Sequence, residues 1–124
     1  MEIDQLTHEI LNSAYKVHTK LGPGLLESAY RTCLVYELKK KKFFVEEEKP
    51  LPLIYDEIKM ECGYRIDILV EKKVVIELKT VEFINDVHIS QVLTYLKLSE
   101  NHVGLLINFY TKSLKDGIKR IILK

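Results

Sequence analysis

Residues 64–80 read Y-R-I-D-I-L-V-E-K-K-V-V-I-E-L-K-T, and this stretch decides how the chain folds. Two runs rich in β-branched apolar residues flank the charged triplet 71–73, a pattern that predicts a strand, a turn and a second strand. Side chains alternate between the two faces of a strand. One face should carry Arg65, Asp67, Leu69, Val75, Glu77 and Lys79, and the other face Tyr64, Ile66, Ile68, Val70, Val74, Ile76 and Leu78.

The length of the turn decides whether the charged residues of the two strands meet. If residues 71–73 form a three-residue loop, Val70 pairs with Val74. Asp67 then lies directly opposite Glu77, with the two Cβ atoms about 4.5–5.5 Å apart. A two-residue loop would shift the register by one and turn Glu77 into the apolar face, where a lone carboxylate is costly. The sequence therefore predicts Asp67 beside Glu77, although Glu-Lys-Lys supplies no glycine for a left-handed turn.

Two adjacent carboxylates repel each other unless a cation lies near both. Lys79, two residues after Glu77 on the same face, is one candidate for that cation. A hard divalent cation is the other, because Mg²⁺ typically takes one or two carboxylates together with water and substrate phosphate. A surface hairpin with a salt-bridged polar face is the simpler alternative, and the hairpin alone does not decide between them.

Composition predicts one globular domain spanning residues 1–124, since 47% of the residues are hydrophobic and 30% are charged. A formal net charge of +1 implies no strong overall field, so any basic footprint for nucleic acid must be local. Cys33 and Cys62 form no CxxC motif, which argues against a structural zinc site or a disulfide framework. Without a signal peptide or a membrane-spanning apolar run, we expect a cytoplasmic protein with no membrane partner.

Three further segments have the apolar spacing of helices. They are expected from Asp4 to Leu21, from Gly24 to about Lys40 and from Asp86 to about Leu98. Asp4 and Asp86 are the expected N-caps, and Gly22 ends the first helix. Short strands are expected at residues 43–47, 51–55, 58–61 and 118–123. The apolar run 103–109 predicts a buried strand parallel to the second strand of the hairpin.

Glu27 lies on the apolar stripe of the second helix, three residues before Tyr30 and seven before Leu34. It can be an ordinary first-turn acid, which the helix dipole stabilises by about 0.3–1 kcal/mol. It can also be a third carboxylate that faces a cation. At the other end of this helix, Lys39 to Lys42 suit the negative end of the dipole and could also contact phosphate.

The third helix carries a polar stripe next to its apolar one, made of His88, Gln91 and Tyr95. A helix that follows the Glu77–Lys79 strand directly packs back across the sheet, so this stripe can overlook the two carboxylates. Ordinary amphipathic filler is the alternative interpretation of the same stripe.

In this order and spacing, these motifs resemble a known family. Asp67 followed by Glu77-Leu78-Lys79, between a preceding and a following helix, resembles the core of the PD-(D/E)XK nuclease superfamily, although Ile66 stands where many members have proline. The stretch 24–30, G-L-L-E-S-A-Y, is similar to the signature of the small GxxExxY proteins placed in that superfamily. Gln91 and Tyr95 also look like the Q-x-x-x-Y element of its exonuclease-like branches.

The resemblance implies an α/β, restriction-endonuclease-like core, in which a central mixed β-sheet is flanked by helices. It implies Mg²⁺ or Mn²⁺ bound by Asp67, Glu77, the Leu78 carbonyl and Glu27, with Lys79 assisting water attack and Gln91 steadying the site. Supporting roles would fall to Tyr30, Arg65, His88 and Tyr95, and nucleic-acid contacts to Lys39, Lys40, Lys41 and Lys42. Such a metal would lower the pKa of the attacking water and neutralise charge on the phosphate.

Two functions compete at this point. The first is a metal-dependent nuclease, with DNA a better candidate substrate than RNA. The second is a non-catalytic nucleic-acid- or protein-binding module on a nuclease-like fold, since fold alone does not fix function. Because 19 basic residues nearly cancel 18 acidic ones, one copy offers a small basic footprint. A homodimer or a protein partner would enlarge that footprint.

Overall fold

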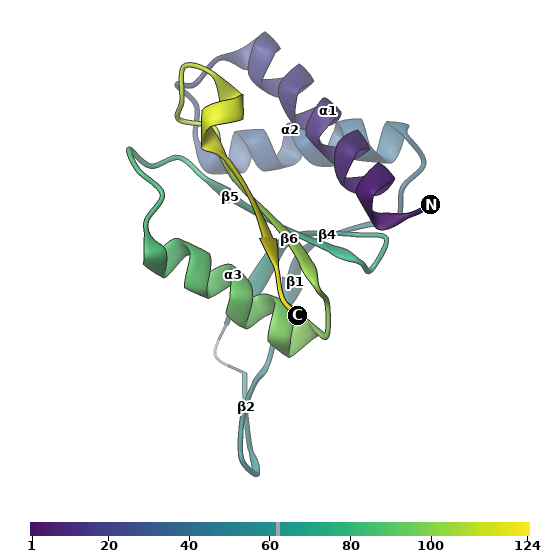
Figure 1. Ribbon diagram of the computed structural model, residues 1–124, viewed down its shortest axis with the longest axis vertical. Helices are drawn as coiled ribbons and strands as arrows, with labels where there is room; N and C mark the ends of the chain where they lie inside the picture. The colour runs from purple at the N-terminus through teal and green to yellow at the C-terminus, as the bar shows by residue number, and fades with distance from the viewer. Residues whose placement is uncertain (62) are drawn as a thin grey trace.

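Five strands form one mixed β-sheet in the order β1-β4-β5-β6-β7, in a computed structural model that describes residues 1–61 and 63–124 (Figure 1). Cys62 lies outside the described residues. The elements, in chain order, are α1 (Ile3–Leu21), α2 (Glu27–Lys40), β1 (Val45–Pro50), β2 (Leu53–Tyr55), β3 (Ile58–Met60), β4 (Arg65–Val70), β5 (Val74–Lys79), α3 (Asp86–Ser99), β6 (Val103–Asn108), the 3-10 turn η1 (Leu114–Gly117) and β7 (Ile118–Ile122).

The strands at the centre of the sheet are β4, β5 and β6. β5 and β6 run parallel, as the apolar run predicted, while the other neighbouring pairs are antiparallel. Helices α1 and α2 cover one face of the sheet and α3 covers the other (Figure 1). A mixed sheet between helices is the architecture that the resemblance implied.

The hairpin β4–β5 has the predicted register, with Val70 paired to Val74 and Ile68 paired to Ile76. Its turn is left-handed without glycine, since φ is 54° at Glu71 and 56° at Lys72. A left-handed backbone normally costs a non-glycine residue about 1–2 kcal/mol. Contacts with the residue before β1 offset this cost. The Glu71 N–H donates to the Phe44 carbonyl at 2.8 Å, and the Phe44 N–H donates to Glu71 Oε2 at 2.5 Å.

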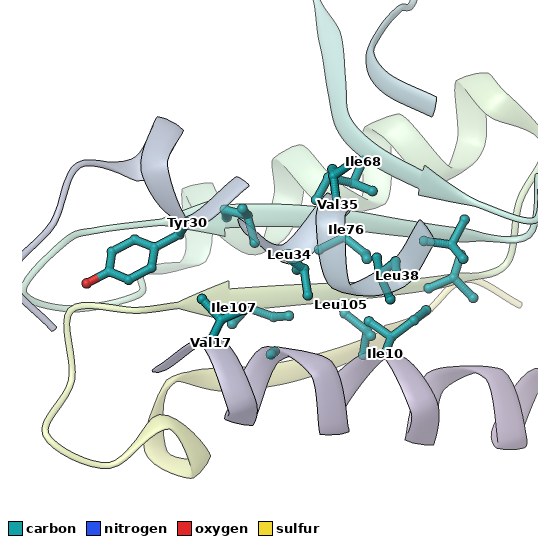
Figure 2. Close-up of a cluster of buried hydrophobic side chains, with 14 of the residues drawn as sticks. Ile10, Val17, Tyr30, Leu34, Val35, Leu38, Ile68, Ile76, Leu105 and Ile107 are labelled. Carbon is teal, nitrogen blue, oxygen red and sulfur yellow. The ribbon is translucent and has the colours of Figure 1, made fainter. Parts of the chain in front are cut away.

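The main core lies between the sheet and the helix pair α1 and α2. Figure 2 shows Ile10 and Val17 of α1 and Leu34, Val35 and Leu38 of α2 meeting apolar side chains from β4, β5 and β6. Most of these side chains are fully buried, and each such burial contributes roughly 1.5–3 kcal/mol. This core fixes the height and tilt of α2 over the sheet, and thereby the position of its first residue, Glu27.

A second core lies under α3, where Leu69 and Val75 pack against Val92 and Leu96. Ile66 belongs to this cluster as well, so the prediction that it shares a face with Ile68 was wrong. The alternation fails between Ile66 and Ile68, where the ladder of β4 with β5 ends, although β4 still pairs with β1 there.

The two predicted N-caps were displaced by one or two residues, while Gly22 ends α1 as predicted. The N-cap of α1 is Glu2, and Asp4 lies in the first turn, where its carboxylate accepts a bond from Arg120 Nη2 at 2.5 Å. The N-cap of α3 is Asn85 rather than Asp86, because an amide at that position can accept the His88 N–H while the His88 ring receives the Asn85 N–H.

Helix α2 begins at Glu27 and not at Gly24, with the exposed Leu26 as its N-cap. The Tyr30 hydroxyl explains the late start. It donates to the Gly22 carbonyl and accepts the Leu25 N–H at 3.1 Å, so it holds the preceding loop in a non-helical course.

The strand boundaries shift in the same way. The first predicted strand becomes β1, which extends to Pro50, while β2 and β3 form a separate two-stranded sheet within the described residues. Their hairpin projects from the end of the sheet that lies away from α1 and α2 (Figure 1). The final strand, β7, ends at Ile122. Within residues 1–61 and 63–124, no helix combines the length and the apolar character needed to cross a bilayer.

Candidate functional site

The candidate site lies where β4 and β5 part. Below the Ile68–Ile76 pair, side chains replace the usual backbone ladder. The Asp67 N–H donates to Glu77 Oε1 at 3.1 Å, and the Leu78 N–H donates to Asp67 Oδ2 at 2.9 Å. Each carboxylate thus holds the backbone of the opposite strand, and the two acids lie side by side as the register predicted.

Burial and mutual repulsion raise the proton affinity of this pair. Glu77 is only 4% exposed, and burial, followed by the negative charge of Asp67, raises the pKa of its carboxyl to about 8. Burial also raises the pKa of Asp67, although the bond from the Leu78 N–H opposes that rise. The two carboxyl groups lie close enough for the protonation of one to affect the pKa of the other. With the pKa of Glu77 raised to about 8, the pair holds a proton at neutral pH.

Lys79 lies near the pair but is engaged elsewhere. Its Nζ donates to Gln91 Oε1 at 3.4 Å, a long hydrogen bond. Among the described residues, no ion pair within 4.0 Å joins Lys79 to either carboxylate. Its charge lowers the pKa of both acids, yet burial outweighs it. Lys79 therefore compensates the pair only in part, and both alternatives from the sequence, Lys79 and a divalent cation, stay open.

Glu27 faces the site from the first turn of α2. It is half-buried, and the pKa of its carboxyl is raised by burial first and by the charge of Asp67 second. Its inward orientation therefore agrees with the interpretation of Glu27 as a third acid near the pair. Even so, no three His, Cys, Asp or Glu side chains in residues 1–61 and 63–124 converge closely enough to hold a metal ion.

Tyr30 positions Glu27 without reaching the acids. Its ring is fully buried and stacks on Phe109, with the ring centroids 4.4 Å apart. Its hydroxyl binds both ends of the loop from Gly22 to Leu25, which leads into α2. The tyrosine of the sequence motif thus fixes the place at which the helix with Glu27 begins.

Helix α3 supplies the polar chain that the sequence predicted, with one exception. Gln91 accepts from Lys79 and donates through Nε2 to the Tyr95 hydroxyl at 3.1 Å. Burial raises the pKa of Tyr95, and the charge of Glu77 is the next cause. His88 serves the helix cap instead, and Arg65 is exposed at the start of β4, away from this hydrogen-bonded chain.

Two residues of the site were not anticipated from the sequence. Arg31 lies one turn after Glu27, and its charge lowers the pKa of both Glu27 and Asp67. Its i, i+4 spacing from Glu27 was the available signal. Asn108 is 2% exposed and holds the chain after β5, since its Oδ1 accepts from the Val81 N–H at 3.1 Å and its Nδ2 donates to the Val81 carbonyl at 2.8 Å. A lone amide inside an apolar run was the signal there.

The lysine run lies far from the acids. Glu27 begins the 14-residue helix that Lys40 ends, a separation of about 20 Å at about 1.5 Å per residue. Two of the lysines also have partners, because Lys41 pairs with Glu9 at 2.9 Å and Lys40 lies 3.8 Å from Glu37. The lysine run therefore lies at the opposite end of α2 from Glu27.

Comparison with known proteins gives one match. The family model described as the PD-(D/E)XK nuclease superfamily matches residues 4–121, a region that contains every residue of the candidate site. No curated protein and no solved structure matches significantly.

Proposed function

The chain belongs to the PD-(D/E)XK nuclease superfamily, and on that premise we propose that it is a divalent-metal-dependent nuclease that hydrolyses phosphodiester bonds. The observation that carries the proposal is the buried acid pair. Asp67 and Glu77 are held side by side by each other's strands. Burial, followed by the negative charge of Asp67, raises the pKa of Glu77 to about 8, and the charge of Lys79 does not provide full compensation. A divalent cation would supply that compensation.

The donor set fits Mg²⁺ or Mn²⁺. One oxygen of each acid already accepts a backbone N–H, which leaves Asp67 Oδ1 and Glu77 Oε2 for a cation. The Leu78 carbonyl is the proposed third protein ligand, and water and substrate phosphate would complete a hard, oxygen-rich shell. When bound, such a metal supplies a water of lowered pKa and a positive charge beside the phosphate.

The remaining residues act on the substrate and on one another. Lys79 would orient the attacking water and offset charge on the phosphate, while Gln91 fixes its ammonium and Tyr95 fixes the Gln91 amide. Glu27 would hold a water or a second cation at the edge of the pair. Arg31 is the second positive charge near the acids and would stabilise the negative charge that develops on the phosphate.

Two finer assignments belong to this proposal. Membership of the GxxExxY proteins is supported by the way Tyr30 holds the loop that precedes Glu27. DNA is the proposed substrate, and Lys39 to Lys42 would contact it only at a phosphate about 20 Å from the cleaved bond.

Calorimetric titration with Mg²⁺ and Mn²⁺ tests the proposal, followed by incubation with labelled single- and double-stranded DNA and RNA. The parent should bind metal and cleave at least one of these substrates, and Asp67→Asn and Lys79→Ala should abolish cleavage. Glu82→Gln is the matched control, because Glu82 is an exposed carboxylate in the loop after β5. A parent protein that binds no metal and cleaves none of the four would contradict the proposal.

A non-catalytic binding module is the second candidate. It is favoured by the net charge of +1 and by the distance of the lysine run from the acids, since both limit phosphate contacts at the site. The same experiment separates the two functions. A binding module would hold nucleic acid equally well in EDTA and in Mg²⁺, and it would leave the strands intact.

A further inference from the structure

A cavity of about 300 Å³ lies beside the acid pair, between α3 and the segments that carry β2 and the start of β4. It is lined by Leu53, Tyr64, Gln91, Thr94, Tyr95 and Leu98. Leucine side chains and tyrosine rings form most of its wall, and Gln91 and Thr94 contribute an amide and a hydroxyl group. A mostly apolar pocket with a few polar groups is typical of sites for planar organic groups.

The cavity and the acid pair share residues. Gln91 lines the cavity and also holds Lys79. Tyr95 lines it as well, and the pKa of its hydroxyl responds to Glu77 and Asp67 on one side and to Tyr64 on the other. A group bound in the cavity would therefore lie next to a phosphate at the acid pair.

The surroundings favour aromatic contacts over ionic ones. Two of the six lining residues are tyrosines and none is charged, and Tyr64 is 46% exposed. The net charge of +1 supplies few counter-charges for a duplex backbone. Stacking of bases on aromatic rings is the other main source of affinity for nucleic acid, and it requires bases that are not already stacked in a duplex.

We propose that this cavity takes an unpaired nucleobase adjacent to the scissile phosphate, and that the substrate is therefore single-stranded DNA or an unpaired DNA end. The inference rests on the proposed function and names its substrate class. The ring of Tyr64 would stack on the base, and Gln91 and Thr94 would hydrogen-bond to the base edge that pairing otherwise occupies.

The test measures binding by fluorescence anisotropy, in EDTA at pH 6.5, where the acid pair carries a proton and no cleavage interferes. The probes are a labelled single strand, the same sequence as a blunt duplex, and a series of strands with one abasic residue at successive positions. The parent should prefer the single strand to the duplex by at least about tenfold, and one abasic position should weaken binding by about 5- to 150-fold, the range for a lost stacking contact.

Variants at the cavity should reproduce the abasic effect. Tyr64→Ala should weaken binding of the intact strand by the same factor and make it insensitive to the abasic residue, while Tyr64→Phe should bind like the parent. Thr94 is an exposed residue of α3, so Thr94→Tyr should fill the cavity without disturbing the core and should weaken binding in the same way. This variant tests the proposal if Tyr64→Ala fails to fold. Tyr55→Ala is the matched control, because Tyr55 is a 67% exposed tyrosine on β2 outside the cavity.

Failure of the proposed base site and failure of the proposed nuclease activity would give different results. Equal affinity for the intact strand and every abasic strand, a preference for the duplex, or failure of the parent to bind any strand would overturn the inference. Metal binding and Asp67-dependent cleavage of blunt duplex would then leave the proposed function standing. An abasic effect without cleavage in Mg²⁺ or Mn²⁺ would instead support the cavity and overturn the nuclease.

Discussion

Replacing Glu77 with glutamine should remove most of the pH dependence of the metal-free protein's stability between about pH 5 and pH 9. Burial and the charge of Asp67 raise the pKa of Glu77 from 4.5 to about 8. The folded state therefore binds the proton more tightly than the unfolded state. The resulting stabilisation is fully present below about pH 4.5 and is lost as pH rises through about 8.

The size of the effect follows from the same pKa values. A rise from 4.5 to about 8 corresponds to an upper bound of roughly 5 kcal/mol, at about 1.36 kcal/mol per pH unit. The proton is shared with Asp67, whose own pKa is also raised, so we expect about 2–5 kcal/mol. That is a large part of the roughly 5–15 kcal/mol by which typical domains are stable.

Urea unfolding followed by circular dichroism, in EDTA at pH 5.5, 7 and 9, measures the effect. The free energy of unfolding of the parent and of the control Glu82→Gln should fall with rising pH, while that of Glu77→Gln should change far less. Added Mg²⁺ should restore stability to the parent at pH 9 and have little effect on Glu77→Gln. Parallel pH profiles for the parent and Glu77→Gln would refute the idea that this carboxyl is protonated in the metal-free fold.

Three further results are expected. Asp67→Asn should weaken Mg²⁺ binding at least about tenfold and raise the metal-free melting temperature, because it removes charge repulsion but keeps shape; unchanged affinity by calorimetry would contradict this. Mg²⁺ binding at pH 7 should release protons, seen as a calorimetric heat that depends on the buffer, and this release should vanish above about pH 9 as Glu77 ionises. Tyr30→Phe should lower the free energy of unfolding in urea by about 1–3 kcal/mol, because it leaves the Gly22 carbonyl and the Leu25 N–H without their hydrogen-bond partner. An unchanged urea midpoint would show that these two hydrogen bonds do not stabilise the loop.

The sequence by itself determined the hairpin and the meeting of its two acids. A period of two leaves one register that keeps Glu77 out of the apolar face, and that register also places Asp67 opposite it. The parallel strand β6 was predictable for a related reason, since a continuous apolar run suits a strand covered on both faces. Both features follow from local pattern and from the high cost of burying charge.

Tertiary contacts decided what local pattern could not. The left-handed turn at Glu71 and Lys72 depends on bonds to Phe44, which is 27 residues away from Glu71. Ile66 packs under α3 because β4 and β5 separate at Asp67, and the strand propensity of isoleucine gives no sign of that separation. Arg31 and Glu27 lie close enough to Asp67 for their charges to interact only because the core under α2 sets the height of the helix over the sheet.

The electrostatics of the site also belong to the tertiary structure. The sequence offered Lys79 as a counter-charge to the acids. In the structure its ammonium donates to Gln91 on α3, and its charge lowers the pKa of Glu77 less than the nearly complete burial of Glu77 raises it. Spacing along a strand can bring two carboxylates together, because the strand period is fixed. The pKa of each depends on solvent exclusion and on charges carried by other elements, and those are set only when the helices pack on the sheet.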